Sequence, residues 1–224
     1  MDEAARAEQD RLLDIMRNDL YVAVVSDVLD SIGLLHQAMD DRLRPLSPQM
    51  RLVGRAHTVM TADIYERSED PYHSEIAAVD ALKPGDVMVA DTNRSTRTCF
   101  WGELLSTASV ARGATGCAID GHTRDALRIM EMGFPLFCTG FRPVDSSYRG
   151  TVVDHGCPVQ VGGVVVNAGD IIFGDYDGIV VVPPQHMAEV VSKAHTKVTS
   201  ENASRDMLRE GAYLRDVYDR FGVL

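Results

Sequence analysis

No run of apolar residues in this chain of 224 approaches the roughly 20 that a helix needs to cross a bilayer. The segment from Met1 to Asp14 is charged throughout, so we expect no signal peptide. Basic residues are scarce too, because 22 Lys and Arg stand against 33 Asp and Glu and give a formal net charge of −11. Proteins that coat nucleic acid and polybasic membrane anchors need a surplus of Lys and Arg. We therefore expect a cytoplasmic protein that binds neither nucleic acid nor membrane.

Paired cysteines and several common catalytic signatures are also missing. Cys99, Cys117, Cys138 and Cys157 form no C-x-x-C pair, which disfavours a zinc ribbon, and we expect them to be small buried residues. The sequence has no Gly-x-Gly-x-x-Gly, no phosphate-binding Gly-Lys-Ser/Thr, no Gly-x-Ser-x-Gly and no His-Glu-x-x-His. These absences remove several standard classes of enzyme.

What remains is the pattern of one continuous α/β domain, 45% hydrophobic and 25% charged. Short apolar segments with the character of strands alternate with segments of helical character, which predicts parallel strands joined by crossover helices. We expect these strands at 52–60, 87–90, 117–119 and 135–138, and these helices at 72–82, 101–112 and 124–132. Four more short strands, expected to form a compact β-rich unit, lie at 158–161, 164–166, 170–173 and 178–182.

Both ends of the chain are expected to be helical and to extend a core of about 27–184. The first 35 residues predict one helix over 1–20 and a second over 24–35, with Ser26 as its N-cap. After Pro183-Pro184, apolar residues fall on one face of a further helix. We expect the C-terminal segment 185–221 to pack on its own domain or to reach a neighbouring subunit.

Two short segments combine residue types that suit the binding of a small acid. Gly102-Glu103-Leu104-Leu105 and Arg124-Asp125 both lie near junctions of expected strands and helices, where ligands of α/β proteins collect. Gly102 permits close approach of the backbone, and the first N–H groups of the following helix can hold a carboxylate.

The pair Arg124-Asp125 adds charge of both signs. Arg124 offers a planar fork for a carboxylate or keto oxygen, and Asp125 is a hard oxygen ligand of the kind that holds Mg²⁺. Together with the Gly102 segment they predict a site that binds and polarises a small 2-oxo acid. The same residues also fit a simpler interpretation, in which Arg124 faces solvent and Asp125 complements the dipole of an ordinary helix.

Two other features are candidates for chemistry. His122 is the one histidine that lies inside the Arg124-Asp125 loop. The segment Asp175-Tyr176-Asp177-Gly178 contains acids that suit a metal, but its Asp and Gly content favours a hairpin turn.

Ordered motifs along most of the chain, from about Asp27 to Gly211, resemble the RraA-like family. This family holds the 4-hydroxy-4-methyl-2-oxoglutarate aldolases and the regulators of ribonuclease E activity. The resemblance implies an α/β fold of the swivelling, phosphohistidine-domain-like β/β/α type, assembled as homotrimers or homohexamers with sites between subunits. It also implies a class II pyruvate aldolase mechanism that uses Mg²⁺ or Mn²⁺. The motifs are Asp120-Gly-His-Thr-Arg-Asp125, Met132-Gly-Phe-Pro-Leu-Phe137, Gly140-x-x-Pro143, Val161-Gly-Gly-Val-Val-Val166, Gly169-Asp170 and Asp175-Tyr-Asp-Gly-Ile-Val-Val-Val-Pro183.

The resemblance also implies a role for each candidate site residue. The backbone amides of Gly102, Glu103, Leu104 and Leu105 would hold the pyruvyl carboxylate. Arg124 would contact the substrate, and Asp125 would be the direct metal ligand. Glu103 would order metal-bound water, together with Glu201 supplied by the C-terminal helix of a neighbouring subunit.

Because the chain keeps the Arg124-Asp125 pair, the resemblance favours an enzyme over a regulator. The expected reaction is cleavage of a 4-hydroxy-2-oxo acid, of the 4-hydroxy-4-methyl-2-oxoglutarate or 4-carboxy-4-hydroxy-2-oxoadipate type, to pyruvate. Decarboxylation of oxaloacetate is the expected side activity. The alternatives are a regulator that binds and inhibits ribonuclease E, and a decarboxylase or lyase of the same fold that acts on another oxo acid.

The identity of the substrate is the least constrained part of this expectation. The segments 64–73 and 92–98 depart from the pattern of the aldolases and are expected to line the distal part of the pocket. Residues 92–150 hold seven Arg and five acids, a local balance of +2. This local balance points towards a small di- or tricarboxylate.

Overall fold

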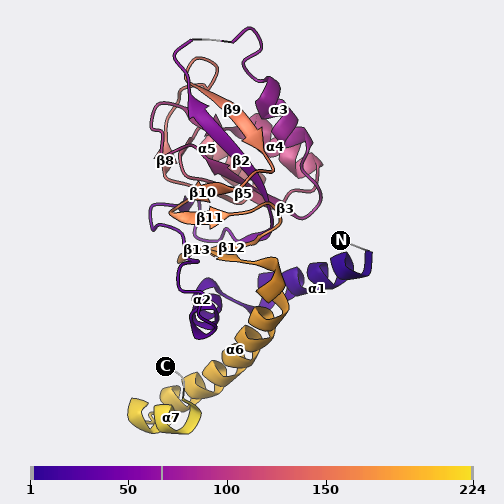
Figure 1. Ribbon diagram of the computed structural model, residues 1–224. Coiled ribbons are helices and arrows are strands. Elements are labelled where there is room, and N and C mark those ends of the chain that lie inside the picture. The colour runs from indigo at the N-terminus through magenta and orange to yellow at the C-terminus, as the bar shows by residue number, and fades with distance from the viewer. Residues whose placement is uncertain (1–2, 67, 223–224) are drawn as a thin grey trace.

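A mixed eight-stranded sheet occupies the centre of the molecule, a computed structural model that describes residues 3–66 and 68–222 (Figure 1). The strand order is β1-β7-β5-β3-β2-β12-β13. The long strand β2 (Leu52–Asp63) pairs through its first half with β12 and through its second half with β9 (Gly150–His155). The expected α/β class, with helices at both ends, is confirmed.

The parallel core of this sheet is confirmed as well. β2, β3 (Asp86–Asp91), β5 (Gly116–Ile119) and β7 (Leu136–Cys138) run parallel, and β1 (Arg44–Pro45) pairs antiparallel with β7. The crossover helices are α3 (His73–Asp80), α4 (Glu103–Ala111) and α5 (Ala126–Met132). Strands buried on both faces read as unbroken apolar runs, which is why their positions could be predicted.

The expected compact β-rich unit does not form, and this prediction is wrong. Only β10 (Val159–Val161) and β11 (Val164–Val166) make a separate hairpin. β12 (Ile171–Asp175) and β13 (Gly178–Val182) join the main sheet instead, because β12 pairs with β2. The turn between β12 and β13 is the hairpin that the Asp175–Gly178 segment favours.

A second, smaller sheet was not expected from the sequence. It consists of β4 (Cys99–Trp101), β6 (His122–Thr123) and β8 (Gly140–Phe141), all parallel. These strands follow β3, β5 and β7 along the chain, so the small sheet lies beyond the carboxyl ends of the parallel core. Trp101 belongs to β4, and the helix expected from residue 101 begins two residues later.

Helices from both ends of the chain cover the main sheet at β12 and β13. α1 (Glu3–Asp19) and α2 (Val22–Ser31) pack with the start of α6 (Met187–Arg209) on β12 and β13, in one apolar cluster. The single turn η1 (Pro184–His186) leads into α6, whose far half runs away from the sheet towards α7 (Leu214–Phe221) (Figure 1). None of the described helices combines the length and apolar character needed to span a membrane.

The predicted N-cap of the second helix is wrong. Ser26 lies inside α2, which begins at Val22 after Tyr21. The backbone N–H of Val22 donates instead to Oδ2 of Asp175, over 2.8 Å. A carboxylate from the β12–β13 turn thus satisfies the start of the helix, which a local sequence pattern does not reveal.

Candidate active site

The two segments singled out in the sequence line one pocket of about 400 Å³. Six of the predicted residues are here: Gly102, Glu103, Leu104, Leu105, Arg124 and Asp125. The rest of the lining comes from α3 and the residue before it, from β4 and from the loop after β8, and consists of Tyr72, Glu75, Ile76, Cys99, Phe100, Trp101, Asp145 and Ser146. The pocket therefore lies beyond the carboxyl ends of the parallel strands, where the small sheet meets α3 and α4.

A side chain at Gly102 would crowd the Arg124-Asp125 pair. Its backbone is extended, and a Cβ atom placed on it would lie 2.9 Å from Oδ2 of Asp125 and 3.4 Å from Cγ of Arg124. The residue that follows, Glu103, donates its backbone N–H to the same Oδ2 over 3.2 Å. The glycine thus allows the first turn of α4 to touch the Arg124-Asp125 pair directly.

Asp125 has a strained backbone. It lies at the N-cap of α5 with φ 59° and ψ 26°, a left-handed conformation that costs a non-glycine residue about 1–3 kcal/mol. The neighbouring N–H of Arg124 is fixed by a 3.0 Å hydrogen bond to the carbonyl oxygen of Trp101. Strain of this kind persists where the surrounding structure enforces it, and it clusters at functional sites.

The surroundings of Asp125 suit a metal that keeps most of its ligands as water or substrate. Its side chain is 42% exposed at the pocket. Across the described residues, no group of three or more His, Cys, Asp or Glu is arranged to enclose a metal. A single carboxylate facing a pocket fits the way Mg²⁺ is bound, through one or two carboxylates with water and substrate completing the octahedron.

Arg124 is held in place by a carboxylate. Its Nη1 lies 3.0 Å from Oδ1 of Asp145. Asp145 also accepts hydrogen bonds from the hydroxyl of Tyr72 and from the backbone N–H of Ser147. Burial by itself raises the pKa of Asp145, but these hydrogen bonds and the charge of Arg124 outweigh it and lower the pKa to about 2. Asp145 is therefore ionised and orients the guanidinium at neutral pH.

Glu75 of α3 is a site residue that sequence reasoning missed. Its Oε2 accepts a 3.1 Å hydrogen bond from the hydroxyl of Ser146. Burial raises the pKa of Glu75 to about 7, and the charge of Asp145 adds to this rise while Ser146 and Arg124 oppose it. The pocket thus contains a carboxyl group that exchanges its proton near neutral pH, as general acid–base groups do.

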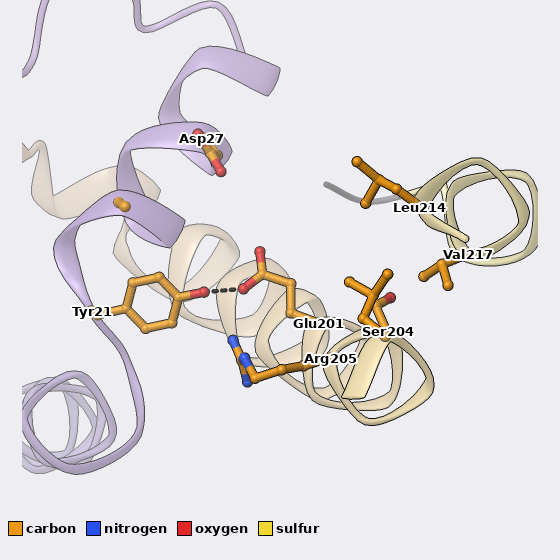
Figure 2. A pocket seen from close by; sticks show the side chains of 9 residues that line it. Tyr21, Asp27, Glu201, Ser204, Arg205, Leu214 and Val217 are labelled. Atoms are coloured by element: carbon orange, nitrogen blue, oxygen red, sulfur yellow. Dashed lines mark hydrogen bonds between the residues drawn. The ribbon is translucent and has the colours of Figure 1, made fainter. Parts of the chain in front are cut away.

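Glu103 and Glu201 lie in different pockets of the chain. Oε1 of Glu103 accepts a 2.8 Å hydrogen bond from the hydroxyl of Thr107, which holds its carboxylate on α4. Glu201 lines a pocket of about 340 Å³ between α2, α6 and α7, where it accepts a hydrogen bond from Tyr21 (Figure 2). Burial and this hydrogen bond raise the pKa of Tyr21 to about 12. The supply of Glu201 by a neighbouring subunit stays a prediction.

The cysteines, His122 and Asp175 lie in surroundings that suit a structural role. All four cysteines are free, and all but Cys157 are buried, largely as expected. His122 forms part of β6, outside the pocket of Arg124, and its ring packs close to Gly140. Asp175 accepts N–H groups from Val22 and Asp177, so its carboxylate serves the hairpin and the start of α2.

Fold and pocket together define an α/β protein in which one arginine and four carboxyl groups meet beyond the carboxyl ends of parallel strands. Comparison with known proteins agrees with this description. The sequence pattern described as RraA-like: Aldolase/RraA matches residues 22–181, and the chain belongs to this family.

Individual relatives support the assignment. A protein of Halalkalibacterium halodurans named "Putative 4-hydroxy-4-methyl-2-oxoglutarate aldolase" is 30% identical over 179 residues, 80% of each chain. Protein DlpA of Legionella pneumophila is 28% identical over 199 residues, which are 89% of this chain but 32% of DlpA. The chain thus spans about a third of the length of DlpA.

Solved structures with the same fold include two that cover most of the chain. An uncharacterized protein of Pseudomonas syringae superimposes with a TM-score of 0.84 at 26% identity, covering 95% of this chain and 94% of its own. RraAS2 of Streptomyces coelicolor is described as an unusual member of the RNase ES inhibitor RraA family. It superimposes with a TM-score of 0.78 at 29% identity, covering 88% of this chain and 98% of its own.

Proposed function

We propose that this protein is a divalent-metal-dependent lyase that cleaves a 4-hydroxy-2-oxo acid to pyruvate and a second carbonyl compound. The observation that carries the proposal is the meeting of the Gly102–Leu105 segment, Arg124 and Asp125 in one pocket. The aldolase name of the relative from Halalkalibacterium halodurans supports it.

The chain's own groups suit the 2-oxo acid end of such a substrate. The first N–H groups of a helix have no partner within the helix, and in α4 that of Glu103 is taken by Asp125. The backbone N–H groups of Leu104 and Leu105 are therefore left to bind the substrate's carboxylate. Arg124 is placed to stabilise the charge that develops on the C2 oxygen. Asp125 would hold Mg²⁺ or Mn²⁺, which supplies Lewis-acid stabilisation of the same oxygen when bound.

The reaction needs one proton acceptor and one proton donor. The C3–C4 bond breaks with its electron pair left on C3, the C4 hydroxyl loses its proton and becomes a carbonyl, and C3 is then protonated to give pyruvate. Glu103 can take the hydroxyl proton through an ordered water, and Glu75, with a pKa of about 7, is a second acceptor in the same pocket. The electron pair left on C3 makes the enolate of pyruvate. The same enolate forms when oxaloacetate loses CO₂, so we expect decarboxylation of oxaloacetate as a side activity.

The test is a coupled assay for pyruvate over a panel of 4-hydroxy-2-oxo acids and oxaloacetate, with and without Mg²⁺. Above a blank without protein, which corrects for the spontaneous decarboxylation of oxaloacetate, pyruvate should form only when the metal is present, and Asp125→Ala should abolish this formation. Pyruvate release that survives both EDTA and Asp125→Ala would contradict the proposal.

Assembly is part of the proposal. We infer a single-domain subunit that forms a trimer or hexamer with sites between subunits. Leu104, at the pocket, and Leu127, on α5, are 76% and 73% exposed, which are apolar surfaces suited to burial against another subunit. A mass of one subunit, about 24.6 kDa, in light scattering would contradict this inference.

The description of RraAS2 favours a second candidate function, a regulator that binds a ribonuclease. Retention of ribonuclease E in a pull-down, together with no metal-dependent turnover of any 2-oxo acid, would establish this function in place of the lyase.

A further inference from the structure

Trp101 stands at the point where the two halves of the site meet. It is the last residue of β4, directly before Gly102, and the one tryptophan of the chain. The residue is 1% exposed, and its ring stacks on that of Phe134 with the centroids 6.2 Å apart and 12° between the planes. This packing holds the indole in one orientation, so its polar N–H points in one fixed direction.

The indole N–H is bonded to the first turn of α4. Nε1 of Trp101 donates to Oγ of Ser106 over 2.8 Å, and this hydroxyl donates in turn to the carbonyl oxygen of Gly102 over 3.1 Å. The backbone N–H of Ser106 donates to the same carbonyl oxygen over 3.1 Å. Ser106 is fully buried, which shields these bonds from solvent. A side chain as well as the backbone therefore closes the turn from Gly102 to Ser106.

The backbone of Trp101 is bonded to the other half of the site. Its carbonyl oxygen accepts the N–H of Arg124 and the hydroxyl of Thr123, each over 3.0 Å. Thr123 is fully buried and pairs with Trp101 in the small sheet. One residue thus holds α4 through its side chain and the Arg124 loop through its carbonyl group, and a substitution of the side chain separates the two contacts.

The position of this turn matters because the backbone N–H groups of Leu104 and Leu105 belong to it. A hydrogen bond weakens steeply when its length or angle departs from the optimum, so the turn must stay in place to hold a carboxylate. Gly102 cannot supply this rigidity, since glycine has the widest choice of backbone conformations. The bond between the indole and the buried hydroxyl restrains the turn that begins with this glycine.

We propose that Trp101 is a positioning residue, which acts through Ser106 to hold the first turn of α4 where its free amides receive the carboxylate of a 2-oxo acid. This inference rests on the proposed lyase function and adds a residue to it. Amides that hold the carboxylate equally in the ground state and the transition state lower KM and leave kcat unchanged. A merely structural role would lower the melting temperature and leave KM unchanged.

Trp101→Phe tests the inference, because it removes the indole N–H and keeps both a ring and the carbonyl group that Arg124 and Thr123 need. In the presence of Mg²⁺, we expect KM for the 2-oxo acid and the Kd of pyruvate, measured by calorimetry, to rise by about tenfold. The value of kcat should stay within about threefold. Ser106→Ala should have the same effect, and the double variant should be no worse than the weaker single variant, because both changes break one chain of bonds.

Ser109→Ala is the matched control. Ser109 is buried in the same helix and donates its hydroxyl to the carbonyl oxygen of Leu105 over 2.7 Å, whereas the chain's one indole is bonded to Ser106. This variant should keep the wild-type KM and Kd. An equal rise of both in Ser109→Ala would overturn the inference, because any loss of packing in α4 would then weaken binding.

The remaining outcomes separate the inference from the function on which it rests. Unchanged KM and Kd in Trp101→Phe, or a fall in kcat alone, would overturn the inference and leave the lyase function intact. If Trp101→Phe does not fold, Ser106→Ala decides by the same measurements. No turnover of any 2-oxo acid by the wild type would overturn the lyase function, and the inference with it.

Discussion

The backbone N–H of Glu103 donates to Oδ2 of Asp125 across 3.2 Å, and this bond joins two loops that lie 22 residues apart in the sequence. It fixes one oxygen of the carboxylate at the edge of the pocket. The two segments that the sequence marks separately therefore act as one unit, and a change in either should disturb the other.

Gly102→Ala tests this contact. The backbone at residue 102 is extended, with φ −155°, so alanine can adopt it, but its Cβ would meet Oδ2 of Asp125 at 2.9 Å. Displacement of a reacting group by about 1 Å can cost about 100-fold in rate. We expect kcat/KM for pyruvate release to fall by about that factor while the melting temperature changes little.

Gly133→Ala is the matched control for the same measurements. Gly133 ends α5 with φ 68° and has open space around it, so alanine would meet strain but no clash. Here we expect a loss of about 1 kcal/mol of stability with the activity retained. The reverse pattern in the two variants would show that the Gly102 contact has no part in the site.

Arg124→Lys keeps the charge but loses the planar fork. An ammonium group cannot bond Asp145 and also present a second fixed donor to the C2 oxygen of a substrate. We expect kcat to fall by about 100-fold, measured by steady-state pyruvate release. A loss of less than about threefold would show that charge alone suffices at this position.

Glu75 should make the stability of the protein depend on pH. Burial raises its pKa from 4.5 to about 7, so between these values the folded state holds a proton that the unfolded state has lost. The stability that Glu75 contributes is therefore complete below about pH 4.5 and falls as the pH rises through 7, by about 3 kcal/mol as an upper bound.

Thermal melting of the wild type and Glu75→Gln from pH 5 to pH 8 measures this effect. The variant should gain in melting temperature relative to the wild type as the pH rises, since glutamine cannot ionise. Residue 75 is surrounded by Asp145, Arg124 and Ser146 in both proteins, so the titration of these neighbours cancels in the comparison. Parallel curves at every pH would contradict the raised pKa.

Co-expression of two inactive variants tests whether neighbouring subunits share the site. If Glu201 serves a neighbour's pocket, Arg124→Ala subunits mixed equally with Glu201→Gln subunits should recover about a quarter of wild-type activity, because that fraction of sites receives both intact residues. Arg124→Ala mixed with Asp125→Ala should recover none, since both residues line one pocket of one chain. Full activity of Glu201→Gln by itself would assign Glu201 to the Tyr21 pocket alone.

The sequence predicts the parallel core well because strands such as β3 and β5 are continuous apolar runs between helices. β4, β6 and β8 escape prediction because strands of two or three residues carry no periodicity. The Arg124-Asp125 loop could be found from its residue types and its place near a strand–helix junction. Glu75 could not, because its raised pKa depends on burial and on Asp145 and Ser146, which are about 70 residues away.

The small sheet also holds the loops around the pocket together. Arg124 and Arg142 donate their backbone N–H groups to Trp101 and Thr123, each over 3.0 Å, so the loops after three successive core strands hold one another in register. Such loops are ordered before any ligand arrives, and association then needs no loop to fold over it. The rate of substrate capture should accordingly follow diffusion and charge, and the amide protons of Arg124 and Arg142 should exchange with solvent as slowly as those of the core strands.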